Sequence, residues 1–464
     1  MANAAAGART CRVLVPSGVI GSGCPQAAID RGITLRPDAI AVDAGSTDSG
    51  PHYLGTGSTK MTRKALKRDL RQLMLARDTL RVPLLIGSCG TCGTDSGVDM
   101  MAALCAEIAH EENLEARVAR VYSEQQAETL APFLARGAIS PLAPARAVTQ
   151  ATLDECTHIV ALLGHAPLVA ALDAGADIVL AGRTTDTAVL AAVPLMRGLP
   201  PEHCWHAAKV AECGGFCTTR TDRGGVLFEI CENGYTIEPL HADNACTPYS
   251  VAAHLLYENA DPFVLKEPGI ELDTSNAQYE AIDARRVHVR GASIRTMTYT
   301  LKLEGAAAIG YRTMGFTAIA DPHVLRSIDA WVAKLRQTIV RGAQQVLGHP
   351  PGSYELDLRA YGWNALNPDV ARAPEPPPRE VGVMLLVTAP TQAMASEIAR
   401  WANPYLLHLP LHDDDPMPSF AFPYSPAEAE LGAVFEFRLN HVVQVEDPLA
   451  LSRMRIDDAR ACTQ

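Results

Sequence analysis

The chain has 464 residues, of which 48% are hydrophobic and 5% aromatic, and its formal net charge is −12. This length predicts two or three domains. The negative charge argues against nucleic acid or an anionic membrane as a partner of the surface as a whole.

The first residues, MANAAAGARTCRVLVPSGVIGSG, lack a basic segment followed by a sustained apolar run. They are therefore not typical of a signal peptide. No apolar stretch approaches the ~18 residues of a membrane span. We expect a cytoplasmic protein whose twelve cysteines are reduced thiols.

The first 203 residues alternate short β-rich apolar runs with longer amphipathic runs. Continuous apolar strands joined by helices are typical of a parallel sheet covered on both faces. We therefore expect an α/β domain with a mostly parallel sheet, and we favour an open doubly wound sheet over a closed barrel. Strands are predicted at 12–16, 39–43, 82–86, 116–121, 158–163 and 177–180, with helices at 62–76, 98–110, 124–135, 167–174 and 187–196.

The pattern changes after residue 203. Alternating strands at 225–230, 235–240, 284–290 and 296–303, with a long amphipathic helix at 323–342, predict a more antiparallel α+β region over 204–372. The Pro-rich segment 373–379 is the clearest linker, because proline extends neither a helix nor a central strand. A strand at 381–388, a helix at 391–402 and a strand-like segment at 433–443 then predict a small C-terminal α+β domain over 380–464.

A short pattern recurs after three of the predicted strands, at 41–49, 87–96 and 181–187. Each copy is a glycine-containing loop followed by Thr-Asp-Ser or Thr-Asp-Thr, with the carboxyl groups of Asp48, Asp95 and Asp186. Ligands of an open parallel sheet bind at the carboxyl ends of its strands, so we expect these loops to form one site. The carboxylates would act as general acid or base, or hold Mg²⁺ or Zn²⁺. Alternatively, each side chain only caps the following helix.

Arg183 is the candidate clamp for a substrate carboxylate, because its guanidinium fork can bind both oxygens; a structural salt bridge is the alternative. His165 and His241 are candidates for the acid–base partner, since histidine titrates near neutral pH, although a structural role fits each equally well. Hydroxyl and amide groups on the same loops, and one later in the chain, would hold the substrate. They belong to Ser46, Thr47, Ser88, Thr184, Thr185 and Asn244.

Two local cysteine pairs, Cys89/Cys92 and Cys213/Cys217, could bind a metal or form a redox pair. A single C-x-x-C motif is a weak metal signal, so buried or loop thiols are the favoured interpretation. Basic residues on one side of the helix at 62–76 could hold the phosphates of coenzyme A, although such a run is more often a solvated helix face. Ordinary dinucleotide-binding, P-loop and α/β-hydrolase motifs do not occur in the sequence.

Several segments together resemble the acyclic terpene utilisation A (AtuA) family. They are DAGSTD at 43–48, GRTTDT at 182–187, CTPYSVAAHLLYE at 246–258, and KLEG at 302–305 with GYR at 310–312. The resemblance covers most of the chain and is closest to the shorter members. It implies breakdown of terpenoids through acyl-CoA intermediates, together with a small companion subunit. The family's second loop carries small residues where Cys89 and Cys92 stand here, which weakens a metal role for these thiols.

These observations predict a lyase of the hydratase/dehydratase type, acting on a hydroxy or unsaturated carboxylic acid or its CoA ester. Arg183 and the loop hydroxyls would hold the carboxylate or thioester oxygen, and one of the three aspartates would move the proton beside the carbonyl. No cofactor is required, although Mg²⁺ or Zn²⁺ could serve. The alternatives are a metal-assisted hydrolase or isomerase and a ligand-binding subunit that needs its companion. We expect a homo-oligomer.

Overall fold

The computed structural model describes residues 9–367 and 378–462. The chain forms two compact units, Met1–Ala307 with Phe437–Gln464, and Ala308–Glu436. This division differs from the boundaries predicted at 203/204 and 379/380, because strands from both 204–307 and 437–464 pair with strands of the first unit. Of the predicted linker, residues 373–377 lie outside the described residues.

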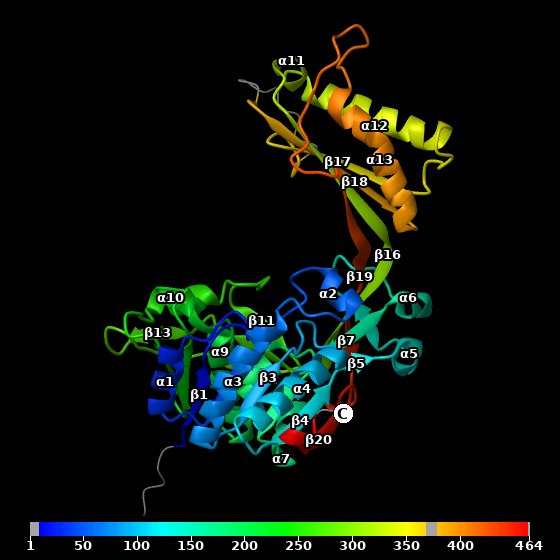
Figure 1. Cartoon of the computed structure of the whole chain (residues 1–464). Helices are drawn as coiled ribbons and strands as arrows, with labels where there is room; N and C mark the ends of the chain where they lie inside the picture. The colour runs from blue at the N-terminus through cyan, green and yellow to red at the C-terminus, as the bar shows by residue number, and fades with distance from the viewer. Residues whose placement is uncertain (1–8, 368–377, 463–464) are drawn as a thin grey trace, which may run out of the picture. The chain divides into compact units, whose positions relative to one another are not determined.

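A ten-stranded open sheet forms the centre of the first unit (Figure 1). The strand order is β13-β14-β10-β9-β1-β2-β3-β8-β4-β20. In this order the bounds are Gln278–Ala281, Val287–Arg290, Gly234–Pro239, Val226–Cys231, Cys11–Val15, Ala39–Asp43, Leu84–Gly87, Ile178–Ala181, Arg117–Tyr122 and Arg453–Asp458. The α/β class and the open sheet are confirmed, and the sheet does not close into the alternative barrel.

The sheet is mixed rather than mostly parallel. Its central strands β1, β2, β3, β8 and β4 pair in parallel. Strands β9, β10, β14 and β13 extend one edge, and β20 the other, in antiparallel pairings. Parallel pairing is thus limited to the five central strands, and four antiparallel strands on one edge and one on the other complete the sheet.

Side chains of the central strands alternate between two cores, as the two-residue period of a strand requires. In β1, Val13 and Val15 enter one core and Leu14 enters the other. The first core is covered by α7 (Ala166–Asp173), α8 (Asp186–Met196) and α9 (Pro201–Ala211). The second is covered by α1 (Gln26–Thr34), α3 (Arg63–Leu80) and α4 (Asp95–Glu111), which lie side by side in Figure 1.

Smaller elements complete the first unit. A three-stranded antiparallel sheet has the order β11-β12-β15. Strand β7 pairs with the first residues of β16 and with β5, and β6 pairs with the last residues of β19. The bounds are β11 Val264–Glu267, β12 Ile270–Asp273, β15 Ser293–Thr296, β5 Glu124–Gln125, β6 Ile139–Pro141, β7 His158–Leu162, β16 Thr300–Ile319, β19 Glu428–Gln444, α2 Pro51–Thr56, α5 Ala127–Ala135, α6 Gln150–Glu155, α10 Pro248–His254, η1 Gly214–Cys217 and η2 Ala459–Ala461.

The second unit has its own hydrophobic core. The later residues of β16 pair antiparallel with β18 (Val381–Ala389), which pairs antiparallel with β17 (Glu355–Tyr361). Helices α12 (Ile328–Gln345) and α13 (Gln392–His408) contribute Trp331 and Ile398 to this core, and the short α11 spans Pro322–Leu325. Across the described residues of the whole chain, no helix is both long and apolar enough to cross a bilayer.

Candidate active site

The loops that follow β2, β3 and β8 touch one another. Backbone hydrogen bonds join Ala44 N to Gly87 O and Ser88 N to Gly182 O, each at 2.9 Å. Gly45 has φ +143°, and a Cβ there would lie 2.6 Å from the Cα of Thr91. At Gly93, with φ +70°, a Cβ would lie 2.0 Å from the backbone nitrogen of Arg183. Only glycine allows such close approach, so these glycines let the three loops pack together.

Threonine, not aspartate, caps the helices that begin after the second and third loops. Thr94 Oγ1 accepts a hydrogen bond from Gly97 N, and Thr185 Oγ1 accepts one from Ala188 N. Asp95 and Asp186 are each the first residue of the helix that follows. The capping alternative thus holds for the threonines, and it leaves the aspartate side chains available for other contacts.

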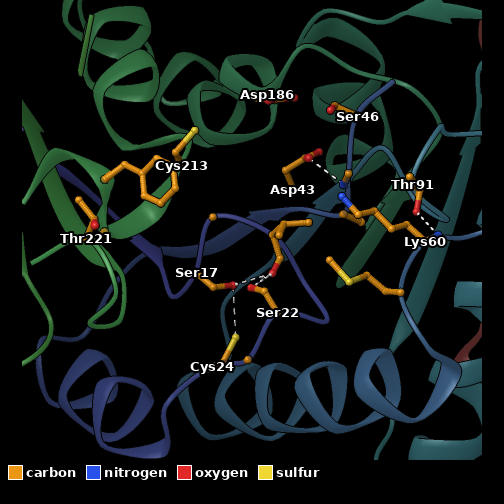
Figure 2. Close-up of a pocket in the computed structure, with 18 of the residues that line it drawn as sticks. Ser17, Ser22, Cys24, Asp43, Ser46, Lys60, Thr91, Asp186, Cys213 and Thr221 are labelled. Carbon is orange, nitrogen blue, oxygen red and sulfur yellow. Dashed lines mark hydrogen bonds between the residues drawn. The ribbon is translucent and has the colours of Figure 1, made fainter. Parts of the chain in front are cut away.

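A cavity of about 1010 Å³ opens beside all three loops, and the second loop contributes Thr91 to its lining. Figure 2 shows Asp43, Ser46 and Asp186 on one side of it and Cys213 and Thr221 on another. The remaining wall comes from the segment after β1, the start of α3 and the residues after α10. The cavity therefore lies at the carboxyl ends of β1, β2 and β8, where ligands bind in open α/β sheets.

Asp43 is the most deeply placed carboxyl group of this cavity. It ends β2 and is 5% exposed. Its Oδ2 accepts a hydrogen bond from Gly45 N at 2.8 Å, whereas its buried Oδ1 has no partner among the described residues. Burial and the nearby Asp186 raise the pKa of Asp43 well above its usual value, although Arg183 opposes the shift.

Asp186 presents the second carboxyl group, and its side chain is 30% exposed because it faces the cavity. Burial raises the pKa of Asp186 to about 6, against the opposing charge of Arg183. Two carboxyl groups that repel each other do not both ionise readily. The repulsion between Asp43 and Asp186 therefore favours the form in which one of them is protonated.

Arg183 lies behind these carboxyl groups and is not part of the cavity lining. It is 6% exposed; its Nε donates to Glu304 Oε2 at 3.1 Å and its Nη1 donates to Ser88 Oγ at 3.1 Å. Glu304 also accepts from Lys302 Nζ at 2.9 Å. Arg183 therefore takes part in a buried ion pair with Glu304, and its role as a substrate clamp stays a prediction.

Three predicted acid–base residues lie away from the cavity lining. Asp95 Oδ2 accepts a hydrogen bond from Arg453 Nη2 at 2.5 Å. His165 packs edge-on against Trp205, with ring centroids 5.5 Å apart, and burial lowers its pKa. The ring of His241 accepts a hydrogen bond from Asp243 N at 3.2 Å. None of the three is among the residues that border the cavity.

The predicted hydroxyl and amide groups divide in the same way. Ser46 and Asp48 line the cavity, and Ser46 Oγ donates to Asp48 Oδ2 at 2.6 Å. Asn244 is buried and exchanges hydrogen bonds of 3.0 Å with the backbone of Arg220, which holds the loop containing Thr221 in the cavity wall. The other predicted residues lie in the three loops but do not line the cavity. They are Thr47, Ser88, Thr184 and Thr185.

Three basic residues of α3, Arg63, Lys67 and Arg71, are paired with acids of α4. Lys67 Nζ, for example, lies 2.8 Å from Glu107 and 2.6 Å from Glu111. The remaining cations at the cavity are Lys60, whose Nζ donates to Ser49 Oγ at 2.9 Å, and Arg68, which is paired with Asp69. The run on α3 is thus mainly an interhelical ion-pair face, and Lys60 is the cation best placed to meet an anionic substrate.

Metal-ligand geometry does not occur at the predicted aspartates. Within the described parts of the chain, two groups of side chains could hold a metal ion, Glu212 with Cys213 and His254, and His323 with His412 and Asp415. Neither group contains Asp48, Asp95, Asp186, Cys89 or Cys92. All twelve cysteines are free thiols.

Sequence reasoning missed Asp43, Lys60 and Glu304. Asp43 had a visible signal, because it is a charged residue at the end of the buried strand AIAVD. Glu304 lies in the motif KLEG, but its pairing with a residue 121 positions away could not be read from the sequence, and Lys60 had no signal.

The open mixed sheet defines an α/β protein, and the acidic cavity at the carboxyl ends of its parallel strands is its candidate active site. The chain belongs to the AtuA family, described as acyclic terpene utilisation family protein AtuA. The family model matches residues 85–412. No curated protein and no solved structure matched the chain. Membership implies a role in acyclic terpene utilisation and suggests a catabolic enzyme.

Proposed function

We propose that the protein is a hydro-lyase that adds water to, or removes it from, a branched acyclic carboxylic acid or its CoA ester. The observation that carries this proposal is the pair Asp43 and Asp186, which border one cavity and have raised pKa values. Family membership supports the substrate class.

The two carboxyl groups differ in a way that suits acid–base chemistry. Asp186, with a pKa of about 6, is ionised near neutral pH and can accept a proton from the carbon beside the carbonyl. Burial raises the pKa of Asp43 well above its usual value, which favours the protonated form that can donate a proton to the departing hydroxyl group. In dehydration the C–H and C–O bonds break, a C=C bond forms and water leaves. Hydration is the reverse.

Other groups bind and position the substrate in this proposal. The Lys60 ammonium group lines the cavity, where it can attract the carboxylate of a free acid or the phosphates of a CoA ester. Ser46 presents its hydroxyl group on the same wall. The volume of about 1010 Å³ is at the upper end for small-molecule sites, and it accommodates an extended branched chain.

The test is a panel of unsaturated and hydroxylated acyclic terpenoid acids, each as free acid and CoA ester. Incubation in D₂O followed by mass spectrometry would report both water addition and deuterium entry beside the carbonyl. We expect both with the wild-type protein and their loss in Asp43→Asn and Asp186→Asn. His165→Gln is the control, because His165 lies away from the cavity. Turnover by both aspartate variants at the wild-type rate, or no exchange with any substrate, would contradict the proposal.

A further inference from the structure

A second group of polar side chains lies where α9 and α10 end. Glu212 and Cys213 directly follow α9, and His254 is the last residue of α10. One ligand atom from each of the three side chains lies within 4.8 Å of the other two. Cys213 also lines the cavity, as Figure 2 shows. The proposed reaction uses none of these three residues.

The imidazole of His254 has a buried nitrogen without a hydrogen-bond partner among the described residues. The residue is 5% exposed, and its Nε2 is buried with no hydrogen-bond partner among the described residues. Its ring stacks on Tyr257, with centroids 5.6 Å apart, which fixes the plane of the ring. A buried ring nitrogen without a partner is costly. A ligand that accepts its lone pair would remove this cost.

Carboxyl groups also gather around this cluster, and a bound cation would favour their ionised forms. Glu212 is 6% exposed and contacts the ammonium group of Lys209 at 2.5 Å. Glu267 and Asp186 lie within electrostatic reach of the same ammonium group. Glu267 Oε1 accepts a hydrogen bond from Thr187, while its buried Oε2 lacks a partner in the described structure. The carboxyl groups thus outnumber the ammonium group that faces them.

We propose that Glu212, Cys213 and His254 bind a Zn²⁺-class transition-metal ion in the cavity wall. Thiolate, imidazole and carboxylate are the ligands that Zn²⁺ takes, whereas Mg²⁺ and Ca²⁺ prefer oxygen alone. Three protein ligands leave a fourth position free, as in catalytic zinc sites. Because Cys213 lines the cavity, that position would face the substrate. Lys209 would orient Glu212 through the carboxylate oxygen that it already contacts.

The metal site can be tested separately from the proposed reaction, because metal binding can be measured without substrate. Once bound, the ion would polarise a substrate oxygen. The second candidate cluster, in the other unit, is a weaker one. His323 and His412 are exposed, and His323 Nε2 already contacts Asp415 at 3.0 Å. It nevertheless supplies an internal comparison for the experiment.

The test is titration of the full chain, after chelator treatment, with Zn²⁺ by calorimetry and with Co²⁺ by absorption spectroscopy. We expect one tight equivalent per chain and a thiolate-to-cobalt charge-transfer band. Cys213→Ser should abolish the band, and His254→Gln and Glu212→Gln should weaken binding by at least 10-fold. Cys231→Ser, a partly buried thiol outside the cluster, should change neither signal.

Further variants separate this proposal from the others. Asp186→Asn should retain the metal even where it abolishes turnover, so the failure of one proposal leaves the other standing. Circular dichroism would show that each ligand variant is folded, and His254→Gln serves if Cys213→Ser does not fold. The proposal is overturned if the wild-type chain binds no tight equivalent. It is equally overturned if binding persists in both Cys213→Ser and His254→Gln, or is lost only in His412→Gln.

Discussion

The starts of α4 and α8 are two regions with nearly the same sequence pattern and different surroundings. In both, a threonine caps the helix and an aspartate follows as its first residue. Asp95 is held by Arg453, which comes from strand β20 near the end of the chain. Asp186 faces the cavity beside Asp43. The motif builds the same local structure twice, and the distant residues that reach each copy determine what its carboxyl group can do.

Replacing Asp95 and Asp186 in turn tests most strongly whether the two helix starts differ in function. We expect Asp186→Asn to lower kcat by about 10²- to 10⁴-fold, because a proton-transfer group is lost. Asp95→Asn should keep kcat within a few-fold of wild type, because Asp95 lies outside the cavity lining. Steady-state kinetics on any substrate turned over in the panel would measure both. Equal losses of kcat in the two variants would contradict the different roles of Asp186 and Asp95.

The ion pair behind the active loops can be broken in a similar way. Glu304→Gln leaves the buried Arg183 without its closest carboxylate, so we expect a loss of about 3 kcal/mol in the free energy of unfolding. Glu271→Gln removes the partner of Arg295, whose side chain is 68% exposed, and should cost less than about 1 kcal/mol. Urea denaturation of both variants measures the difference, and similar costs would show that the buried pair has no special role.

The pH dependence of stability should identify Asp186 as a carboxyl group with a raised pKa. Between its usual pKa near 4 and its folded pKa of about 6, the folded state holds the proton more tightly, so stability falls as pH rises. Relative to wild type, Asp186→Asn should gain about 1 to 2 kcal/mol over this window.

Glu304→Gln supplies the opposite sign for this measurement. Burial disfavours the charged form of Glu304, yet Arg183 and Lys302 hold its pKa below the usual value. Its stabilising contribution is therefore present above about pH 4.5 and declines as pH falls further. Thermal melts of wild type and both variants from pH 3.5 to 8 would show the two trends, and a flat difference for Asp186→Asn would contradict the assignment.

The smallest effect is expected at the partner of Asp95. Arg453 is 60% exposed, so Arg453→Met should lower the free energy of unfolding by no more than about 1 kcal/mol and leave kcat unchanged. Chemical denaturation and the same turnover assay would report both values. A large change in kcat would mean that the start of α4 contributes to catalysis after all.

Local patterns in the sequence predicted the elements that depend on local chemistry. The buried strands, the loops rich in glycine and threonine, and the two acidic helix starts all follow from periodicity and turn chemistry. The alternation in β9 and β10 likewise indicated an antiparallel hairpin. These features require only neighbours within about ten residues.

The rest of the site depends on contacts between distant segments. The ion pair of Arg183 could not be predicted, because its partner Glu304 comes from β16 and is distant in the sequence. Cys213 was paired in the sequence with Cys217, whereas the fold brings it to His254. Asp43 was overlooked because the Thr-Asp pattern directed attention to Asp48. Each difference comes from tertiary pairing, which local propensity does not encode.

The edge strand β20 has a consequence for the order in which the chain can fold during synthesis. It pairs with β4 of the central sheet, and it is synthesised only after the whole second unit, Ala308–Glu436. If the earlier strands pair as they are synthesised, the edge of β4 stays uncovered while the 129 residues of the second unit follow. An exposed edge strand readily pairs with other chains. The interval before residues 453–458 arrive is thus the stage at which a nascent chain would most need a chaperone.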